Sequence, residues 1–382
     1  MATVNIALQN QTTSSTVYAY ITGQALDNNN ALFLLQSDGK TYYYPTSPSS
    51  TCSALGQDCA IPLGAPGNTT TVTVPHLAGS RIWFSVDGTL TFLLNPGPAL
   101  VEPSVTNPTD PNINLSWDFC EFTFNAAELF VNISYVDFVC LPISLTLVNT
   151  SNATQYVSGM ASTGLDTVCQ GLTAQTASDG AGWSSLIVPN QSDGNLRALS
   201  PNNGITLNSS LFNGYYQNYA NQVWSQYTSQ QLSIDTQASW GTVAGQVDSS
   251  SLLDFGNGLA FTQPSAADIF SCSTGPFAVG SNIELGALIA RLSAAFNRST
   301  LLIDSVEPTA TPSQYYQNAI TNHYARIVHA ANLDGIGYAF PYDDVTPTNG
   351  VNQSGAVQDP SPQLLTVAVG GGNASSGLTI QK

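Results

Sequence analysis

The chain has 382 residues, of which 42% are apolar and only 8% are charged, and its 24 acidic residues against 7 Lys and Arg give a formal net charge of −17. The five arginines are scattered, so no basic surface is expected, which excludes nucleic acids and anionic membranes as partners. The length suits two or three domains or one elaborated domain, and no apolar run reaches the roughly eighteen residues of a membrane-spanning helix.

Short strand patterns dominate the chain from residue 3 to about residue 150. They are separated by Gly, Pro, Asn and Asp, and the tetrapeptide SDGK at residues 37–40 is a hairpin-turn signal. The strand-like stretches include TVNIALQN, TVYAYITG, TTTVTVPHL, RIWFSVDGTLTFLLN, CEFTFN and YVDFVCLPISLTLVN. Evenly spaced short strands of this kind predict a β-sandwich or a β-barrel.

The pattern changes after residue 151. Residues 158–208 are rich in Gly, Ser, Thr and Asn and predict loops with little helix. Apolar residues then recur at helical spacing in 211–227 and 285–296, and the pair Thr311-Pro312 predicts the start of a helix that runs towards His329. Strand patterns return in GIGYAFPY, residues 335–342, and in QLLTVAVGG, residues 363–371.

This order of elements predicts two domains. A β domain covers residues 1–155, a mixed α/β domain covers 156–310, and residues 311–382 return to the β domain. We expect the last strand, Leu364 to Val369, to complete the sheet of the β domain.

Six cysteines are spread through the chain without a CxxC pair, which disfavours a zinc ribbon or a thioredoxin-type site. Their even number predicts two or three disulfides in an oxidising compartment, and buried free thiols are the alternative. Eleven N-x-[ST] sequons also favour secretion and glycosylation. The N-terminal residues begin a strand pattern at once, so we interpret the sequence as a mature chain after an added start codon and expect a secreted, extracellular, monomeric glycoprotein.

Several catalytic motifs are missing from the sequence. There is no HExxH, no GxSxG, no P-loop and no complete dinucleotide fingerprint, and the three histidines fit ordinary structural positions. A dispersed Ser-His-Asp triad remains an alternative that no motif supports. Carboxylates are therefore the strongest candidates for chemistry.

One pair of carboxylates stands out in the stretch WDFCEFTFNAAELFVNISYVDFVCLPI, residues 117–143. If the two strand patterns in it pair antiparallel with Cys120 opposite Cys140, Glu121 and Asp137 become diagonal neighbours on one face, roughly 7–8 Å apart. Inverting glycosidases place their two carboxyls roughly 6.5–9.5 Å apart, so that a water fits beside the sugar. The alternative is that both side chains are solvated on a half-exposed strand.

Other acidic and aromatic residues fit structural roles better. Asp118 is predicted to hold a turn or cap, and Glu128 to be solvated in the connecting loop. Asp343 and Asp344 either line a groove or hold a loop, and the loop role is favoured. Trp83, in a strand pattern, is predicted to lie in the core.

The same carboxylate segment carries a family resemblance. WDFCEFTFN followed by YVDF resembles glycoside hydrolase family 64, the β-1,3-glucanases named for releasing laminaripentaose. RIWFSVDGTL (81–90), LFNGYYQNYANQVWSQY (211–227) and FSCSTGPF (270–277) resemble it too, as do ELGALIARLSAAFNRSTLL (284–302) and NLDGIGYAFPYDDV (332–345). The resemblance covers nearly the whole chain.

The resemblance implies a thaumatin-like β-barrel or sandwich domain beside a mixed α/β domain, with a wide groove between them. It implies inverting, endo-type hydrolysis of β-1,3-glucan, with Glu121 as the general acid and Asp137 as the general base and without a metal or an organic cofactor. The residues that match its glucan contacts are Thr123, Asn125, Phe130 and Ser134. The family pattern has tryptophan where Phe130 stands and threonine where Ser134 stands, so the sugar-stacking role of Phe130 competes with a core role.

Two other functions remain open at this point. A non-catalytic, thaumatin-like β-glucan-binding protein keeps the groove without turnover. A hydrolase with a dispersed triad would react with a serine-directed covalent inhibitor. The presence of both acids favours the glucanase.

Overall fold

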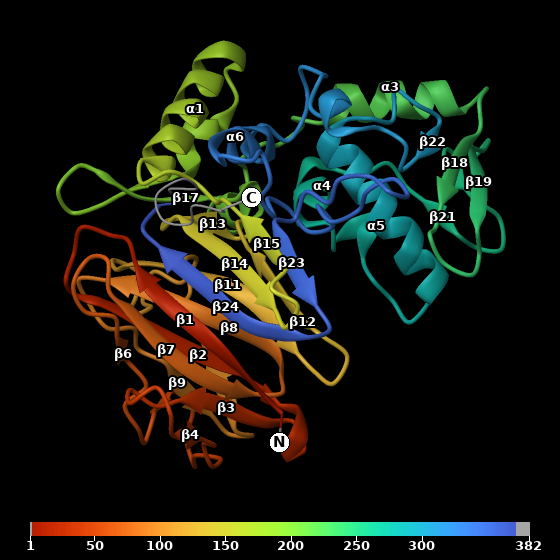
Figure 1. Cartoon of the computed structure of the whole chain (residues 1–382). Helices are drawn as coiled ribbons and strands as arrows, with labels where there is room; N and C mark the ends of the chain where they lie inside the picture. The colour runs from red at the N-terminus through yellow and green to blue at the C-terminus, as the bar shows by residue number, and fades with distance from the viewer. Residues whose placement is uncertain (1, 372–382) are drawn as a thin grey trace.

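Two open β-sheets packed face to face form one part of the molecule (Figure 1). The computed structural model describes residues 2–371. The smaller of the two sheets has the strand order β15-β14-β24-β1-β7. Its strands are β15 (Thr154–Val157), β14 (Ile143–Asn149), β24 (Pro362–Val369), β1 (Thr3–Asn10) and β7 (Thr69–Pro75).

The larger sheet has the strand order β23-β12-β11-β8-β2-β3-β4, with β6 paired to β2. Its strands are β23 (Ala356–Asp359), β12 (Leu129–Ile133), β11 (Ser116–Phe124), β8 (Leu77–Val86), β2 (Val17–Ala25), β3 (Ala31–Leu35), β4 (Tyr42–Tyr43) and β6 (Ile61–Pro62). A small third sheet contains β10 (Ala99–Val101), β9 (Leu93–Asn95) and β5 (Ser53–Ala54). We call these three sheets the sheet body. The predicted β-rich fold is confirmed, and among the described residues no sheet closes into a barrel.

Alternating apolar residues hold the two large sheets together. Ile6 and Leu8 of β1, Leu145 of β14 and Val131 of β12 are all fully buried. They sit at every second position of their strands, so one face of each strand enters the core. Burial of this shared face supplies the main driving force for stacking the sheets.

The C-terminal strand β24 joins the two ends of the chain. It lies between β1, to which it is parallel, and β14, to which it is antiparallel. The predicted strand at Leu364 to Val369 is confirmed, and it occupies the middle of its sheet. Residues near the start, the middle and the end of the chain therefore share one sheet.

Residues 158–208 are not mainly loop. They contain α1 (Gly164–Asp179), α2 (Pro201–Leu207) and the strands β16 (Ile187–Pro189) and β17 (Asn195–Leu199), which join β13 (Phe138–Val139) in a small sheet. The prediction was wrong because α1 carries small and β-branched residues that weaken a helical pattern. Its Gly171 has a packing role: a Cβ there would lie 2.7 Å from the side chain of Ile327.

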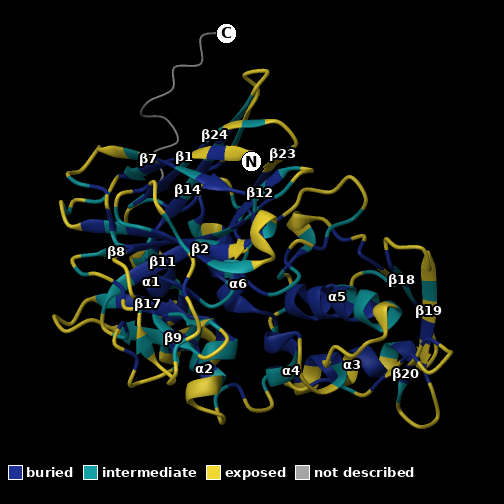
Figure 2. Cartoon of the chain, turned by 90° about the horizontal axis from the view of Figure 1, so that it is seen from below, coloured by how far each residue is buried: buried dark blue, intermediate teal, exposed yellow. Residues whose placement is uncertain are grey.

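A second part of the molecule, which we call the helical lobe, contains α3 (Gln217–Tyr227), α4 (Ala266–Ser271) and α5 (Ile283–Arg298). Its sheet has the order β21-β20-β19-β18-β22, with the strands Ala260–Phe261, Leu253–Asp254, Thr242–Val247, Leu232–Asp235 and Val306–Glu307. The helix predicted from 285–296 is confirmed, whereas that predicted from 211–227 is confirmed only from Gln217, because residues 211–216 form turns. Figure 2 shows that α5 is buried along most of its length.

Two further predictions for the C-terminal third were wrong. Thr311 caps only a short 3-10 turn, Pro312–Gln314, and α6 begins separately at His323 and ends at Ala331, with Asn322 as its N-cap. The stretch 335–342 makes one isolated bridge, between Tyr338 and Ser134, and then turns. In both places, loop hydrogen bonds to capping side chains replace the longer element.

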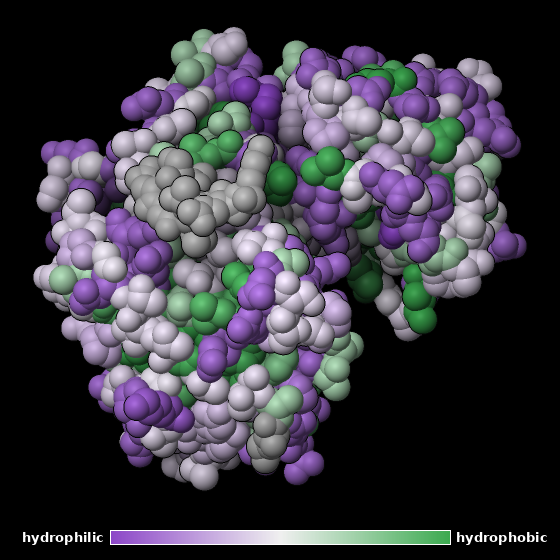
Figure 3. Space-filling model, viewed as in Figure 1, coloured by the Kyte–Doolittle hydropathy of each residue, from purple (hydrophilic) through white to green (hydrophobic). Residues whose placement is uncertain are grey.

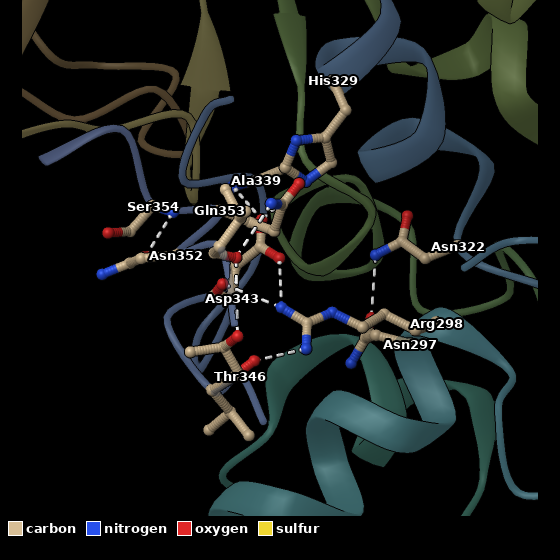
Figure 4. Close-up of polar contacts among 12 residues, drawn as sticks. Asn297, Arg298, Asn322, His329, Ala339, Asp343, Thr346, Asn352, Gln353 and Ser354 are labelled. Atoms are coloured by element: carbon tan, nitrogen blue, oxygen red, sulfur yellow. Dashed lines mark hydrogen bonds and ion pairs between the residues drawn. The ribbon is translucent and has the colours of Figure 1, made fainter. Parts of the chain in front are cut away.

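A buried charge cluster joins α5, α6 and the loop after residue 338 (Figure 4). Arg298 donates to Asp343 Oδ1 at 2.9 Å, and His329 Nε2 lies 2.8 Å from Asp343 Oδ2. Asp343 is completely buried, so the structural role predicted for it is confirmed. Burial raises the pKa of Asp343, but the charges and hydrogen bonds of His329 and Arg298 outweigh burial and hold that pKa below its ordinary value.

The six cysteines are all free, so the predicted disulfides are wrong. Five of them are buried, and Cys52 alone is exposed. The thiols of Cys140 and Cys272 donate to backbone carbonyl oxygens of Leu196 and Ile269. These cysteines fill core positions as small apolar residues, which an even count cannot distinguish from paired residues.

The molecular surface is deeply notched between the sheet body and the helical lobe (Figure 3). The strands β23 and β12, at one edge of the larger sheet, lie on the side of the sheet body next to this notch (Figure 1). No helix among residues 2–371 has the length and apolar character needed to span a bilayer.

Candidate active site

Glu121 lies on β11, near the middle of the larger sheet. Its direct cross-strand partners are Arg81 on β8 and Asn132 on β12. The neighbours of Glu121 along the strand, Cys120 and Phe122, are buried in the core, whereas Glu121 is partly exposed. Strand alternation therefore holds the carboxyl group on the outer face of the sheet, on a rigid element.

The predicted pairing of the two carboxylate strands was wrong. β11 pairs with β12, so that Glu121 is opposite Asn132, and no strand that carries Asp137 pairs with β11. The reason is a tight turn, in which Asn125 Oδ1 accepts the backbone N–H groups of Ala127 and Glu128. This turn brings residues 129–133 back onto β11, one strand earlier than expected.

Asp137 reaches the site by another route. It lies between β12 and β13, and its backbone carbonyl accepts from the N–H of Ser200 and from the side chain of Asn203, both at 2.9 Å. The preceding Tyr135 is held through its carbonyl by the hydroxyl of Tyr324 on α6, at 2.7 Å. Residues from α2 and α6 thus fix the segment that carries Asp137.

Asp118 ties this segment to β11. Its Oδ2 accepts from the backbone N–H groups of Cys140 at 2.8 Å and Leu141 at 3.0 Å, and its Oδ1 accepts from that of Phe119. The structural role predicted for Asp118 is confirmed. Burial raises the pKa of Asp118 to about 7, against the lowering effect of these hydrogen bonds.

A cavity of about 360 Å³ opens beside Glu121. The residues that line it are Gly79, Ser80, Arg81, Glu102, Glu121, Phe122, Thr123, Phe130 and Asn132. A β-bulge in β8 shapes one wall, where the register against β11 shifts and Gly79 takes a φ of +54°. Bulges redirect side chains next to active sites, and glycine adopts this positive φ without a steric penalty.

Two carboxylates contact one arginine at this cavity, and the charge of that arginine also acts on a third. Arg81 Nε donates to Glu121 Oε1 at 3.3 Å, and Arg81 Nη1 donates to Glu102 Oε2. The charges of Arg81 and Glu121 also act on Asp137. Only Arg81 is cationic among these groups, so the site carries excess negative charge when all three acids are ionised.

This environment raises the pKa of two of the three carboxyls. Burial raises the pKa of Asp137, and the charge of Glu121 raises it further, while Arg81 and a hydrogen bond from Asn203 lower it. Burial also raises the pKa of Glu102, with Arg81 opposing and the other two acids adding to the rise. Both shifts favour the protonated forms of these two carboxyls.

Two of the four residues predicted to contact glucan line the cavity. Thr123 and Phe130 line the cavity and are cross-strand partners. Asn125 holds the β11–β12 turn through its Oδ1, and Ser134 is buried at 5% exposure where its backbone bridges Tyr338. Thr123 and Phe130 therefore meet Glu121 at the cavity, whereas Asn125 and Ser134 do not line it.

Sequence reasoning missed Arg81, Glu102 and Asn132. Arg81 could have been identified as a candidate site residue, because an arginine beside the apolar residues of RIWFS is unusual in a chain with five arginines. Glu102 gave no pattern, since its place at the site depends on how the small third sheet folds back. Among the described residues, no cluster of three or more His, Cys, Asp or Glu side chains is arranged to hold a metal.

Comparisons with known proteins give a family match over nearly the whole chain. Residues 2–369 match a family model described as β-1,3-glucanase, glycoside hydrolase family 64. The chain is 28% identical over 303 residues to a glucan endo-1,3-β-glucosidase of Cellulosimicrobium cellulans and over 304 residues to one of Arthrobacter sp. strain YCWD3. Each match covers 78% of this chain and 53% of the relative, so the chain spans about half the length of the curated relatives it matches.

Solved structures show the same fold over almost the whole chain. A laminaripentaose-producing β-1,3-glucanase, solved in complex with laminaritetraose, has a TM-score of 0.85 and 29% identity, with 96% of this chain and 98% of that chain covered. A β-1,3-glucanase domain from Clostridium beijerinckii has a TM-score of 0.74 at 21% identity, again covering 96% and 98%, and shows likeness of fold alone.

Proposed function

Because the chain belongs to glycoside hydrolase family 64, the β-1,3-glucanases, we propose that it hydrolyses β-1,3-glucan at internal linkages. The single observation that carries the proposal is the contact of Glu121 with Arg81 at the cavity, with Asp137, from another segment, close enough for both charges to shift its pKa. The laminaritetraose bound by a structural relative identifies short β-1,3-glucan chains as the first substrates to test.

We propose a single displacement that inverts the anomeric carbon. Glu121 donates its proton to the glycosidic oxygen, and Asp137 takes a proton from a water that attacks the anomeric carbon from the opposite face. The oxygen of that water forms the new bond as the glycosidic bond breaks. The first product therefore carries an α-anomeric hydroxyl, and the two acids exchange protonation states.

The substrate contacts follow from the cavity. Thr123 and Phe130 line the same cavity as Glu121. This placement supports a hydrogen bond from Thr123 to a sugar hydroxyl and stacking of Phe130 on a sugar face. The proposed contacts of Asn125 and Ser134 rest on the family pattern. Asn125 still has its amide nitrogen free for a sugar, since only its oxygen holds the turn among the described residues.

The test is hydrolysis of linear β-1,3-glucan by the wild type, Glu121→Gln and Asp137→Asn. Each variant should lose on the order of 10²- to 10⁴-fold in kcat, the usual contribution of a general acid or base. Glu128→Gln, on the same hairpin as Glu121, is the matched control and should keep full activity. Proton NMR at early times should show the α-anomer first from the wild type, and a β-anomer would refute inversion.

A non-catalytic β-glucan-binding protein is distinguished by the same experiment. The wild type of such a protein would bind glucan without hydrolysing it. The two substitutions could then cause no loss of activity. Glu121 lines the cavity and its charge acts on Asp137, which favours the enzyme.

Compartment, glycosylation, oligomeric state and domain division are proposed as well. We propose secretion, N-glycosylation and a monomeric state from composition and sequons, and a thaumatin-like type for the sheet body. The domain division proposed is residues 1–155 with 311–382, against 156–310, and the central place of β24 between β1 and β14 supports the return of the C-terminal segment.

A further inference from the structure

Arg81 is held on three sides at the candidate active site. Its Nε donates to Glu121 Oε1 at 3.3 Å and its Nη1 to Glu102 Oε2. Its guanidinium carbon lies 4.6 Å from the ring centre of Phe119 and 5.3 Å from that of Trp83. Because Trp83 and Phe119 are themselves buried, the guanidinium plane rests on a rigid aromatic floor.

The two oxygens of Glu121 differ in their surroundings. Oε1 accepts from Arg81, whereas Oε2 has no hydrogen-bond partner among the described residues. The side chain lines the cavity. An anchored oxygen and an open oxygen on one carboxyl suit a group that must present a single oxygen to a substrate.

Glu102 changes the charge balance around Arg81. An arginine beside an acid favours the ionised form of that acid, which opposes proton donation. Glu102 occupies another edge of the same guanidinium and offsets part of its positive charge. It also comes from a different strand region, after β10, so it reaches Arg81 without disturbing β11.

We propose that Glu102 is a positioning residue which, acting through Arg81, holds Glu121 in one orientation and keeps it able to carry a proton. This inference rests on the proposed function of Glu121 as the general acid. The other titratable groups whose pKa the charge of Glu121 raises are Cys120 on β11, Asp137, which precedes β13, and Tyr338. None of these three hydrogen-bonds Arg81 in the described residues.

The kinetic test compares Glu102→Gln and Glu102→Asp with the wild type on linear β-1,3-glucan. Removing the charge should lower kcat by about tenfold with KM changed less than about twofold, because orientation and proton transfer are lost but sugar binding is kept. The basic limb of the pH–rate profile should move to lower pH in Glu102→Gln, and Glu102→Asp should restore part of that shift. Glu128→Gln, which removes an equal charge from the same hairpin as Glu121, should change neither.

A second measurement does not depend on turnover. The chain has five glutamates, so carbon-13 labelling of the glutamate carboxyls gives five resonances that can be titrated by NMR. Glu121→Gln identifies the resonance of Glu121, and its titration midpoint should fall to lower pH in Glu102→Gln. The proposal would be overturned if Glu102→Gln changed neither the titration midpoint of Glu121 nor the pH–rate profile. This holds even if Glu102→Gln lowered kcat.

The two proposals can fail separately. A wild type without hydrolytic activity, but with the expected shift of the Glu121 resonance, would refute the glucanase and keep the link through Arg81. An active wild type whose Glu102→Gln variant is unchanged in rate, profile and titration would refute the role of Glu102 alone.

Discussion

The carboxylate of Asp118 accepts a hydrogen bond of 2.8 Å from the backbone N–H of Cys140, and this contact joins the strand of Glu121 to the segment of Asp137. Glu121 follows Asp118 by three residues, and Asp137 precedes Cys140 by three residues. One buried side chain therefore fixes the spacing of the two candidate catalytic acids, although no backbone ladder connects their segments directly.

Asp118→Asn is expected to damage catalysis more than binding. An amide cannot accept from three N–H groups at the two positions of the carboxylate, so at least one N–H loses its partner at a cost of about 1–3 kcal/mol. The segment of Asp137 then shifts against β11, and kcat should fall by about tenfold or more, because reacting groups tolerate little misplacement. Steady-state kinetics and thermal unfolding measure the two effects.

Asp110→Asn provides the matched control for Asp118. Asp110 is also buried, and its carboxylate also accepts backbone N–H groups, from Ser104 and Asn112. Its substitution should lower stability to a similar degree and leave kcat unchanged. Equal losses of kcat in both variants would show that the effect of Asp118→Asn is only destabilisation.

The acidic limb of the pH–rate profile should report Asp137. Burial raises the pKa of Asp137 above its ordinary value of 3.8, with the charge of Glu121 adding to the rise. A base works only when ionised, so kcat/KM should fall as the pH decreases through this raised pKa. Asn203→Ala removes both the donor to the Asp137 backbone carbonyl and the hydrogen bonding that lowers the pKa of Asp137, and it should move the limb to higher pH. A rate that stays flat down to pH values near 4 would contradict this assignment.

Residue types selected the candidate pair of acids, whereas the strand pairing predicted for that pair was wrong. Glu121 and Asp137 stood out because carboxylates are scarce in this chain and histidine motifs are absent. Their relative placement was predicted from an assumed antiparallel pair, which the Asn125 turn prevents by returning β12 onto β11. A single side chain in a turn thus decides which strand becomes the neighbour of β11, and that choice is not visible in alternation alone.

Long-range partners account for the rest of what the sequence could not predict. Arg81 and Glu102 meet only after β8 and β10 take their places, and α1 packs closely on Ile327 at Gly171, a contact that its own sequence does not show. Regular apolar periodicity, in contrast, identified α5 and the strands of both sheets, since burial of one face enforces it locally.

Phe130→Ala should weaken substrate binding. Phe130 lines the cavity opposite Thr123, and loss of a ring that stacks on a sugar should raise KM by about 3- to 10-fold, the equivalent of about 0.5–1.5 kcal/mol. Phe130→Trp, which restores the family residue, should lower KM or leave it unchanged. Tyr156→Ala, an exposed aromatic at 44% exposure on β15, is the control. An unchanged KM in Phe130→Ala would place Phe130 in the core role.

Glu307 should make the protein less stable as the pH rises towards neutral. Burial raises the pKa of Glu307 from 4.5 to about 7, so the folded chain retains a proton that the unfolded chain releases. The contribution to stability is full below pH 4.5 and is lost as the pH rises through about 7, at about 1.4 kcal/mol per pH unit. Glu307→Gln should remove this slope in denaturant unfolding measured across that range. Glu128→Gln should leave the slope as it is, and an unchanged slope in Glu307→Gln would refute the assignment.

The adjacent residues Asp343 and Asp344 offer the sharpest comparison of structural roles. Asp343 is completely buried between Arg298 and His329, whereas Asp344 is exposed. Asp343→Asn leaves the buried guanidinium of Arg298 without an ionised partner and should lower the free energy of unfolding by about 3–5 kcal/mol. Asp344→Asn, one residue away, should cost less than about 0.5 kcal/mol.

Because the charge cluster joins α5 to α6, and α6 holds Tyr135 next to the site, Asp343→Asn should also reduce kcat at temperatures where the chain is still folded. Equal stability of the two variants in thermal and denaturant unfolding would show that the cluster does not hold this junction.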